Sequence, residues 1–192
     1  MMALGLSLIS KIVGGTRFVL LCSILKWFPV SFSTFMQNKT RFEYGRFSQR
    51  LRYEVYKRLC KRIGINVVIK EGVYIKEPEN IEIGNNVSIQ EYCLLSGYGG
   101  LIIGDNVSIA AGTMIFTSSH SYSDKSINFR NSILEIKPVR IGNNVWIGAG
   151  CRIIGGSIIG NNVIVGAGSV INKTLTDNGI YAGIPARLIK EL

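Results

Sequence analysis

From Ile141 onward, an aliphatic residue recurs at every sixth position. The repeat runs through Ile141, Ile147, Ile153, Ile159, Val165 and Ile171, and Gly directly follows four of these six residues. Four positions after the aliphatic residue comes a second set, mostly small or β-branched: Val145, Cys151, Ser157, Val163 and Ser169. This period predicts short strands that stack as the coils of a parallel β-helix, because each coil can bury its apolar side chains only against its neighbours.

Residues that tolerate a positive φ lie between the predicted strands. They form four similar tetrads, namely Gly84-Asn85-Asn86-Val87, Gly104-Asp105-Asn106-Val107, Gly142-Asn143-Asn144-Val145 and Gly160-Asn161-Asn162-Val163. Gly and Asn adopt left-handed backbone conformations at low cost, so these tetrads predict sharp corners of the coil.

The same phase extends upstream, with two interruptions. The aliphatic positions are Ile83, Ile89, Ile103, Ile109 and Ile115. The step from Ile83 to Ile103 is two residues longer than three repeats, which predicts a small bulge near residues 97–100. The longer step from Ile115 to Ile141 predicts that the polar stretch 121–137 leaves the solenoid as an extended loop, and long loops in repeat proteins are often functional.

The chain of 192 residues is 47% hydrophobic, enough for one core and an attached element. We predict a basic, apolar helical extension over residues 1–64 and the β-helix over 65–192. Residues 48–63 place Leu51, Val55, Leu59 and Ile63 on one helical stripe, with Gly64 as the predicted C-cap.

The formal net charge of +10 lies entirely in the N-terminal third. Residues 1–62 hold twelve Lys and Arg against Glu43 and Glu54, whereas residues 63–192 hold ten basic and ten acidic groups. The apolar runs 3–9 and 18–30 are shorter than the roughly 18 residues of a membrane span, and no signal-peptide cleavage pattern follows them. Two interpretations are compatible with each other: the helices cap the first coil, and residues 1–62 dock on an anionic membrane surface. Without a recognised binding motif, we expect no nucleic-acid partner.

Four cysteines, Cys22, Cys60, Cys93 and Cys151, show no CxxC pairing. They are typical of reduced thiols in an intracellular protein, and we expect a cytoplasmic location. Because the chain has a single His, we expect neither a zinc site nor the zinc chemistry of a carbonic-anhydrase-like β-helix.

Residues 80–192 resemble the hexapeptide-repeat acyltransferase superfamily, in particular its sugar O-acetyltransferase branch, which includes galactoside and maltose acetyltransferases. The segments that carry the resemblance are IEIGNNVSI, LIIGDNVSIAAGTMIFTSSH, PVRIGNNVWIGAG, IIGNNVIVGAGSVINK and YAGIPARLIKEL. The resemblance implies a left-handed β-helix, a homotrimer, and an acetyl-CoA site between neighbouring subunits. The left hand comes from the family, since general crossover rules would predict the opposite hand.

His120 matches the catalytic His that family members place at the end of the coil before the extended loop. An imidazole titrates near neutral pH, so it can accept a hydroxyl proton as the oxygen attacks the thioester, with no covalent enzyme intermediate. Taken without the resemblance, a lone His beside Ser and Tyr is more often an ordinary loop residue.

The resemblance also implies the cofactor contacts. Trp146 matches a Trp that flanks the active cleft, and Ala149 a small residue that contacts acetyl-CoA. Ala167 and the pair Asn172-Lys173 match positions near the pantetheine arm. Two basic residues, Arg187 and Lys190, match cations near the phosphates and adenine of the cofactor. Phosphate groups favour such cations because they form charge-assisted hydrogen bonds. A buried structural Trp146 and solvated tail charges are the plainer alternatives.

The acceptor site departs from the family. Galactoside and maltose enzymes carry Asn and Asp in the coil before the catalytic His, where this chain reads Cys93-Leu94-Leu95-Ser96-Gly97-Tyr98-Gly99-Gly100. We therefore expect O-acetylation of a different sugar, cell-surface polysaccharide or lipid-linked glycan. N-acetylation of an amino sugar and a non-catalytic β-solenoid scaffold remain the alternatives.

Overall fold

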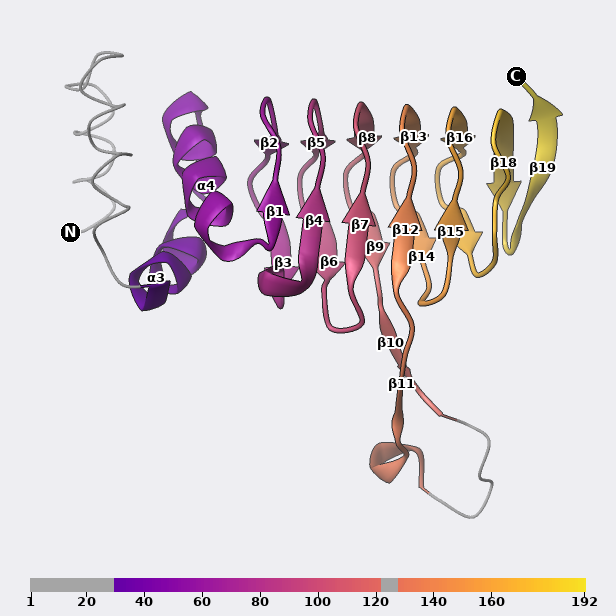
Figure 1. Cartoon of the computed structure of the whole chain (residues 1–192), viewed down its shortest axis with the longest axis horizontal. Coiled ribbons are helices and arrows are strands. Elements are labelled where there is room, and N and C mark those ends of the chain that lie inside the picture. The colour runs from indigo at the N-terminus through magenta and orange to yellow at the C-terminus, as the bar shows by residue number, and fades with distance from the viewer. Residues whose placement is uncertain (1–29, 122–127) are drawn as a thin grey trace.

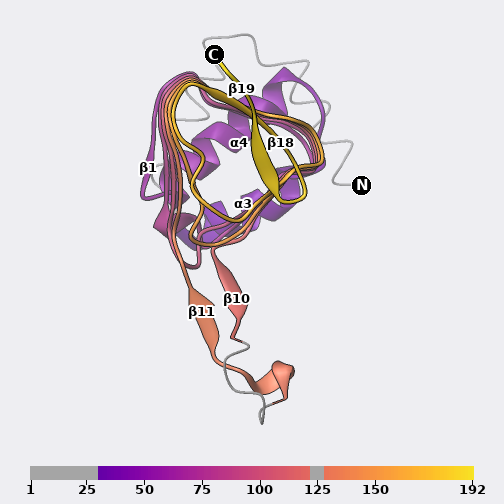
Figure 2. The same ribbon diagram turned by 90° about the vertical axis from the view of Figure 1, so that its right-hand side faces the viewer.

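In the computed structural model, which describes residues 30–121 and 128–192, the chain forms a solenoid of parallel strands with two helices at one end and a hairpin at the other (Figure 1). Seen from the C-terminal end, the chain runs clockwise around the coil while it advances toward the viewer (Figure 2). The solenoid is therefore left-handed. The predicted left-handed parallel β-helix with an N-terminal helical extension is confirmed.

Each complete coil contributes one strand to each of three sheets. The first sheet holds β1 (Arg62–Ile63), β4 (Ile81–Ile83), β7 (Leu101–Ile103), β12 (Val139–Ile141) and β15 (Ile158–Ile159). The second sheet holds β2 (Val68–Ile69), β5 (Ser88–Ile89), β8 (Val107–Ile109), β13 (Val145–Ile147), β16 (Val163–Val165), β18 (Gly179–Gly183) and β19 (Ala186–Glu191). The third sheet holds β3 (Tyr74–Lys76), β6 (Leu94–Ser96), β9 (Met114–Ile115), β14 (Arg152–Ile153) and β17 (Val170–Ile171). We number the coils from the N-terminus by these sets of three.

The aliphatic repeat forms the core of the solenoid. All six residues of the repeat from Ile141 to Ile171 are at most 2% exposed, and the second set of inward positions is equally buried. Each inward position forms a column with its equivalents in the other coils, because each strand pairs in parallel with the equivalent strand of the next coil, as Ile103 does with Ile141 and Ile141 with Ile159. The six-residue period of the sequence therefore predicts which residues pair between coils.

The Asn tetrads form the corner between the first and second sheets. The third residue of each tetrad is Asn with φ near +55°, and two hydrogen bonds join such side chains in successive coils, Asn86 to Asn106 at 3.0 Å and Asn144 to Asn162 at 2.8 Å. The residue before it accepts a backbone N–H from the coil before, with Asn143 Oδ1 2.7 Å from the N of Asp105. These ladders replace the hydrogen bonds that a sharp corner cannot make within one coil.

The two helices cover the N-terminal edge of the solenoid (Figure 1). Helix α3 (Val30–Thr40) packs on α4 (Arg46–Leu59), and α4 contacts β1, β2 and the short 3-10 helix η2 (Pro78–Asn80). Leu51, Val55 and Leu59 are buried as the helical stripe predicted. The expected cap on the first coil is thus confirmed for α4.

The prediction that the helix extends to Ile63 with Gly64 as its C-cap is wrong. Helix α4 ends at Leu59, and Cys60 caps it in an extended conformation with φ −72° and ψ 148°. Arg62 and Ile63 instead form β1, paired with β4, and the N–H of Gly64 donates to the Ile83 carbonyl oxygen. Pairing with the next coil satisfies backbone groups that a longer helix would have satisfied internally, so the solenoid wins at this boundary.

Arg52, one of the basic residues of this amphipathic helix, is structural rather than solvated. Its side chain is buried and donates to the carbonyl oxygens of Thr40, Glu43 and Ile69 at 2.7–2.9 Å, with Glu71 3.7 Å away. Burial lowers the pKa of Arg52, and the nearby Glu71 carboxylate opposes that shift. Arg52 therefore ties α4 to the first coil and to the segment between the helices.

The stretch predicted as an extended loop is an arm that leaves the solenoid at the corner between the third and first sheets (Figures 1 and 2). Its base is an antiparallel hairpin of β10 (Ser118–His120) and β11 (Leu134–Ile136), followed outward by the 3-10 helix η3 (Phe129–Asn131). The bulge predicted near residues 97–100 lies at the same corner, where Gly100 has φ +91° and donates to Gly97. The prediction was right that the chain leaves the solenoid after the coil of Ile115, but it began the loop at residue 121 and missed the strands β10 and β11.

Candidate functional site

His120 is the last residue of β10 and lies on the arm outside the solenoid. It is exposed and pairs in register with Leu134 of β11. Its Nδ1 lies 3.1 Å from the hydroxyl oxygen of Ser132, on the returning side of the arm. This contact holds the ring from one side and leaves Nε2 as the nitrogen that can exchange a proton with a ligand.

Hydrogen bonds to the solenoid fix the base of the arm. The buried hydroxyl of Thr117 donates to the Ser96 carbonyl oxygen at 3.0 Å and accepts the Gly99 N–H at 2.8 Å. The Thr117 carbonyl oxygen accepts the N–H of Lys137 at 3.0 Å. His120 is thus three residues from an anchored backbone, which positions it despite its exposure.

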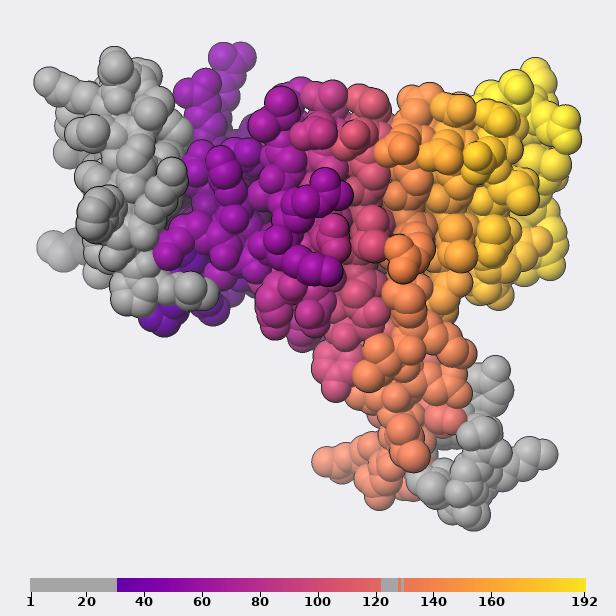
Figure 3. Space-filling model, viewed as in Figure 1, coloured from indigo at the N-terminus to yellow at the C-terminus, as the bar shows by residue number. Residues whose placement is uncertain are grey.

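The arm exposes apolar side chains on its returning strand. Ile133 is 78% exposed, Leu134 41% and Ile136 54%. Figure 3 shows the arm standing away from the solenoid body. An exposed apolar patch of this kind beside His120 indicates a surface that another molecule or subunit contacts.

Small residues line the corner between the second and third sheets in coils 3 to 5. We call this column, residues 110–112, 148–150 and 166–168, the Ala corner. Its turns are stacked, with the Ala149 carbonyl oxygen accepting the N–H of Gly168 at 2.8 Å. Ala149 and Ala167 are exposed, and a Cβ added at Gly112, Gly150 or Gly168 would meet no atom within 4 Å. The Ala corner therefore is a smooth, open strip parallel to the solenoid axis.

Arg187 lies at the C-terminal end of the Ala corner. It pairs with Ala182, and Ala182 packs over Gly166 of the preceding coil. Lys190 lies further along β19, opposite Ile180, and both basic side chains are exposed. The strip thus runs from two alanines to a cation, an order that suits a long ligand with anionic groups at one end.

The other predicted contacts lie elsewhere on the coil. Trp146 points outward from the middle of β13 and is 55% exposed, so it is not a buried structural Trp. It lines a hollow of about 310 Å³ with Ser108, Ile164 and Leu192. Asn172 and Lys173 are exposed residues that directly follow β17, at the corner from which the arm leaves two coils earlier.

A single subunit does not bring all the predicted residues together. His120, Asn172 and Lys173 lie at the arm corner, whereas Ala149, Ala167 and Arg187 lie at the opposite edge of the third sheet. The outer face of that sheet separates the two groups.

Two residues near these groups escaped the sequence analysis. Ser132 touches His120 from a stretch with no repeat to locate it. Arg152 points outward from the third sheet, and its Nη1 donates to the carbonyl oxygens of Gly112, Gly150 and Cys151 at 2.8–3.1 Å, which braces the Ala corner. Its outward phase in the six-residue repeat was the available signal.

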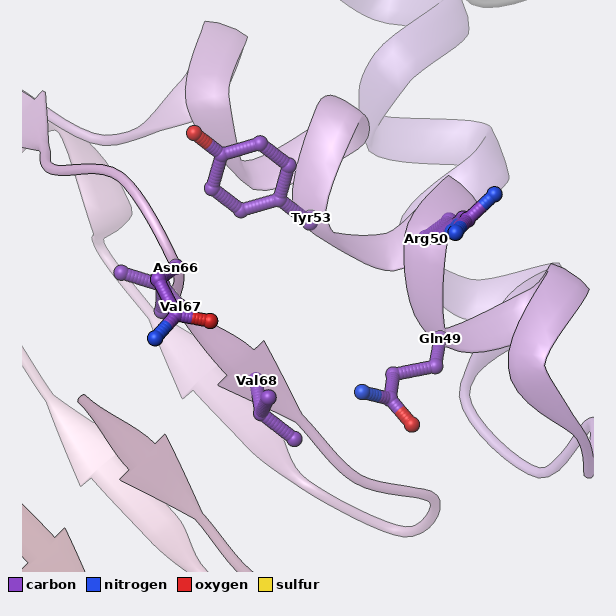
Figure 4. Close-up of a pocket in the computed structure, with 6 residues that line it drawn as sticks. All are labelled: Gln49, Arg50, Tyr53, Asn66, Val67 and Val68. Carbon is purple, nitrogen blue, oxygen red and sulfur yellow. The ribbon is translucent and has the colours of Figure 1, made fainter. Parts of the chain in front are cut away.

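A second hollow, of about 290 Å³, lies between α4 and β2 (Figure 4). Gln49, Arg50 and Tyr53 line it from the helix, facing Asn66 and Val68. None of the predicted site residues contributes to it, and the Tyr53 hydroxyl donates to the Gly64 carbonyl oxygen at 2.9 Å. This hollow is a packing gap at the helical cap.

Burial controls the thiols in the core. Cys60, Cys93 and Cys151 are free and buried, and burial raises the pKa of Cys60 to about 12 and that of Cys93 to about 11. These thiols are protonated and unreactive near neutral pH. Cys22 lies outside the described residues. Within residues 30–121 and 128–192, no group of three or more His, Cys, Asp or Glu side chains could hold a metal ion.

Comparison with known proteins places the chain among transferases. Residues 138–173 match the family model described as bacterial transferase hexapeptide (six repeats). The galactoside O-acetyltransferase of Escherichia coli K12 is 29% identical over 141 residues, which cover 73% of this chain and 68% of that protein. Across six curated relatives, the chain spans 49–73% of the relative's length.

Solved structures give the same grouping. A galactoside acetyltransferase in complex with coenzyme A aligns with a TM-score of 0.74 and 28% identity, over 83% of this chain and 78% of that one. A variant N-acyltransferase from Bacillus cereus, in complex with dTDP-4-amino-4,6-dideoxyglucose and coenzyme A, aligns with a TM-score of 0.57 and 30% identity, over 73% and 88%.

Proposed function

Because this chain belongs to the hexapeptide-repeat acyltransferase family, we propose that it transfers an acetyl group from acetyl-CoA to a hydroxyl group of a sugar or glycan. The observation that carries the proposal is His120, held by Ser132 on an arm anchored to the same coil that begins the Ala corner. The similar galactoside enzymes with bound coenzyme A support the acyl donor.

The residues of the Ala corner fit acetyl-CoA. A pantetheine arm is long and thin, and Ala149 and Ala167 present an open strip with no side chain in its path. The Gly N–H groups of the stacked turns donate between coils, as Gly168 does to the Ala149 carbonyl oxygen, so the remaining backbone groups of the strip would meet the pantetheine amides. Arg187 and Lys190 would meet the phosphates, Trp146 would flank the cleft, and Asn172 with Lys173 would contribute from a neighbouring subunit.

Acetyl-CoA, when bound, supplies the acetyl group as a thioester that an alcohol can attack. His120 Nε2 would accept the proton of the acceptor hydroxyl as that oxygen attacks, and would then deliver it to the departing thiol. For Nε2 to act as a base, Nδ1 must carry the ring proton, and Ser132 Oγ at 3.1 Å can accept it. In the productive tautomer, the Nδ1–H group therefore donates to the Ser132 hydroxyl oxygen.

A homotrimer would complete the site. The arm corner and the Ala corner lie at opposite edges of the third sheet in one subunit, so rotation about an axis parallel to the solenoid would set one subunit's Ala corner against its neighbour's arm. The exposed Ile133, Leu134 and Ile136 on the arm support this assembly, because such a contact would cover them. Light scattering on a size-exclusion column should give three times the mass of 21.1 kDa.

N-acetylation of an amino sugar is the second candidate, and the similarity to an N-acyltransferase with a bound amino-sugar nucleotide favours it. The chemistry at His120 would differ little, because an amine also loses a proton during transfer. A non-catalytic scaffold is the third, and it gives no role to the anchored His120–Ser132 pair.

We also propose that this protein modifies a polysaccharide or lipid-linked glycan at the cytoplasmic membrane face. Exposed basic residues of α4, Arg46, Arg50 and Lys57, support docking of residues 1–62 on anionic lipid. No helix in the described ranges is long and apolar enough to cross a membrane. Deletion of residues 1–36 should weaken sedimentation with anionic vesicles even though Arg46, Arg50 and Lys57 remain, and a full-length protein that never sediments would contradict the docking.

The test of the activity is thiol release from acetyl-CoA with a panel of sugar and glycan acceptors, with the product linkage mapped by NMR. We expect acceptor-dependent release and an ester product, reduced about 10²- to 10⁴-fold in His120→Ala with acetyl-CoA binding retained. An amide product would favour the N-acetyl candidate. Unchanged release in His120→Ala would refute the base assignment, and absence of acetyl-CoA binding would favour the scaffold.

A further inference from the structure

Tyr92 has a backbone conformation that its side chain does not favour. Its φ is +57°, in the left-handed region. Of the eight non-glycine residues with positive φ in the described ranges, six are Asn, and Tyr92 is the one with an aromatic side chain. A left-handed conformation costs a bulky residue roughly 1–2 kcal/mol, so a Tyr at such a position indicates a constraint other than backbone stability.

Other coils place Gly at the same point of the corner between the second and third sheets. The equivalent residues are Gly72, Gly112, Gly150 and Gly168, with φ between +68° and +73°. The turns are stacked at this column. The backbone N–H of Tyr92 donates to the Glu71 carbonyl oxygen at 3.2 Å, and that of Gly112 donates to the Glu91 carbonyl oxygen at 2.9 Å. Gly therefore adopts this conformation without strain in four of the five coils, and coil 2 is the one that has Tyr instead.

The Tyr92 ring is a supported platform. It lies over the backbone of Gly72 in coil 1, where an added Cβ would collide with ring atoms. The neighbouring Tyr92 hydroxyl raises the pKa of Tyr44. The N–H of Gly72 donates to the Arg41 carbonyl oxygen at 2.7 Å, which ties the segment between the helices to this corner. Even so, Tyr92 remains 56% exposed and Tyr44 70%.

The platform lies where the Ala corner ends. In coils 3 to 5 this corner holds only Ala and Gly, at residues 110–112, 148–150 and 166–168, whereas coils 1 and 2 hold Lys70-Glu71-Gly72 and Gln90-Glu91-Tyr92. Adjacent coils are about 4.8 Å apart. A ligand lying along the smooth strip would therefore meet a ring, a carboxylate and an amide in coil 2. The arm with His120 leaves coil 3 at the opposite edge of the third sheet, so His120 of a neighbouring subunit would complete this site.

We infer that Tyr92, whose ring lies over Gly72, is the surface on which a pyranose ring of the acceptor stacks. This inference rests on the proposed function and names the acceptor as a glycan held by one face of a sugar ring. An aromatic face with a polar edge suits such a ring, which has apolar C–H faces and hydroxyls around its rim. Gln90 and Glu91, beside the ring in the same turn, supply polar groups for those hydroxyls.

Tyr92→Gly tests the platform, because Gly is the residue that the fold accepts at this point in four other coils. We expect KM for the acceptor to rise about 3- to 10-fold, the range for loss of one aromatic contact. KM for acetyl-CoA should stay within about twofold, and the melting temperature should not fall, since relief of backbone strain offsets the lost packing on Gly72. Tyr92→Phe should retain most of the affinity, and Phe35→Ala, which removes an exposed ring from α3, is the matched control.

Direct binding separates this inference from the proposed activity. Saturation-transfer NMR with methyl hexopyranosides and glucose tetrasaccharides should show binding to the native protein that Tyr92→Gly weakens. Glycan binding that depends on Tyr92, without any thiol release, would support the platform but refute the proposed acetyltransferase activity. Transfer with an unchanged acceptor KM in Tyr92→Gly, or a raised KM for acetyl-CoA instead, would overturn the platform. If the native protein neither binds nor acetylates any of these sugars, the inference is wrong.

Discussion

Replacing Ser132 by Ala tests how His120 is held for catalysis. The Nδ1 to Oγ contact is 3.1 Å long and lies on an exposed part of the arm. A neutral hydrogen bond contributes about 0.5–1.5 kcal/mol net, and about 1.4 kcal/mol corresponds to a factor of ten. Ser132→Ala should therefore lower kcat about 2- to 10-fold, far less than the 10²- to 10⁴-fold loss expected for His120→Ala.

A double-mutant cycle shows whether Ser132 acts through the imidazole. If it does, adding Ser132→Ala to His120→Ala should lower the residual rate by less than about twofold. Thiol release at saturating acetyl-CoA and acceptor is the assay, and Ser132→Thr should restore the hydroxyl and most of the rate. Ser119→Ala, an equal truncation of an exposed serine on β10, is the control. Equal losses from Ser132→Ala with and without His120 would refute the positioning role.

Three further predictions concern the core and the cofactor contacts. Gly104→Ala should destabilise the fold by several kcal/mol in urea denaturation, because its Cβ would lie 2.5–2.8 Å from atoms of the next coil, whereas Gly112→Ala, which faces open space at φ +69°, should cost only about 1–2 kcal/mol; equal losses would contradict the stacking argument. Burial raises the pKa of Cys93 to about 11, so unfolding releases a proton above the ordinary thiol pKa of about 8.5. Stability should be fully present below about pH 8.5 and fall between that pH and 11, and Cys93→Ala should flatten this part of the melting-temperature curve, which an unchanged slope would refute. Arg187→Ala with Lys190→Ala should raise KM for acetyl-CoA about tenfold but leave KM for acetyl-pantetheine, which lacks the nucleotide phosphates, unchanged; equal effects on both donors would rule out phosphate recognition.

The repeat predicted the solenoid well because its period is a property of every coil. Because several coils repeat the same spacing, one irregular residue does not change the predicted phase. The inward positions of Ile141, Ile147 and Ile153 could therefore be predicted from residue spacing alone. The end of α4 could not be read in that way. Helical periodicity continues through Ile63, but the unpaired edge of β4 competes for the same backbone groups and wins.

For the site, the sequence located residues but not their relations. His120 could be proposed because it is the single His and follows the coil that precedes the insertion. Ser132 could not, since it lies twelve positions after His120 in the sequence and only the hairpin register brings them together. Tyr92 looked like one more tyrosine until its φ and its place over Gly72 were known.

What the sequence determined by itself is whatever repeats: the inward column, the Gly and Asn corners, the place where the arm departs, and the family. These follow from local spacing, because every coil meets the same neighbours. Only the tertiary structure decided where the helix yields to the first strand, that Arg52 is buried as a tie rather than solvated, and that His120 and the Ala corner lie at opposite edges of one sheet. Those outcomes depend on which groups compete for the same partner in space, and a linear pattern does not contain that competition.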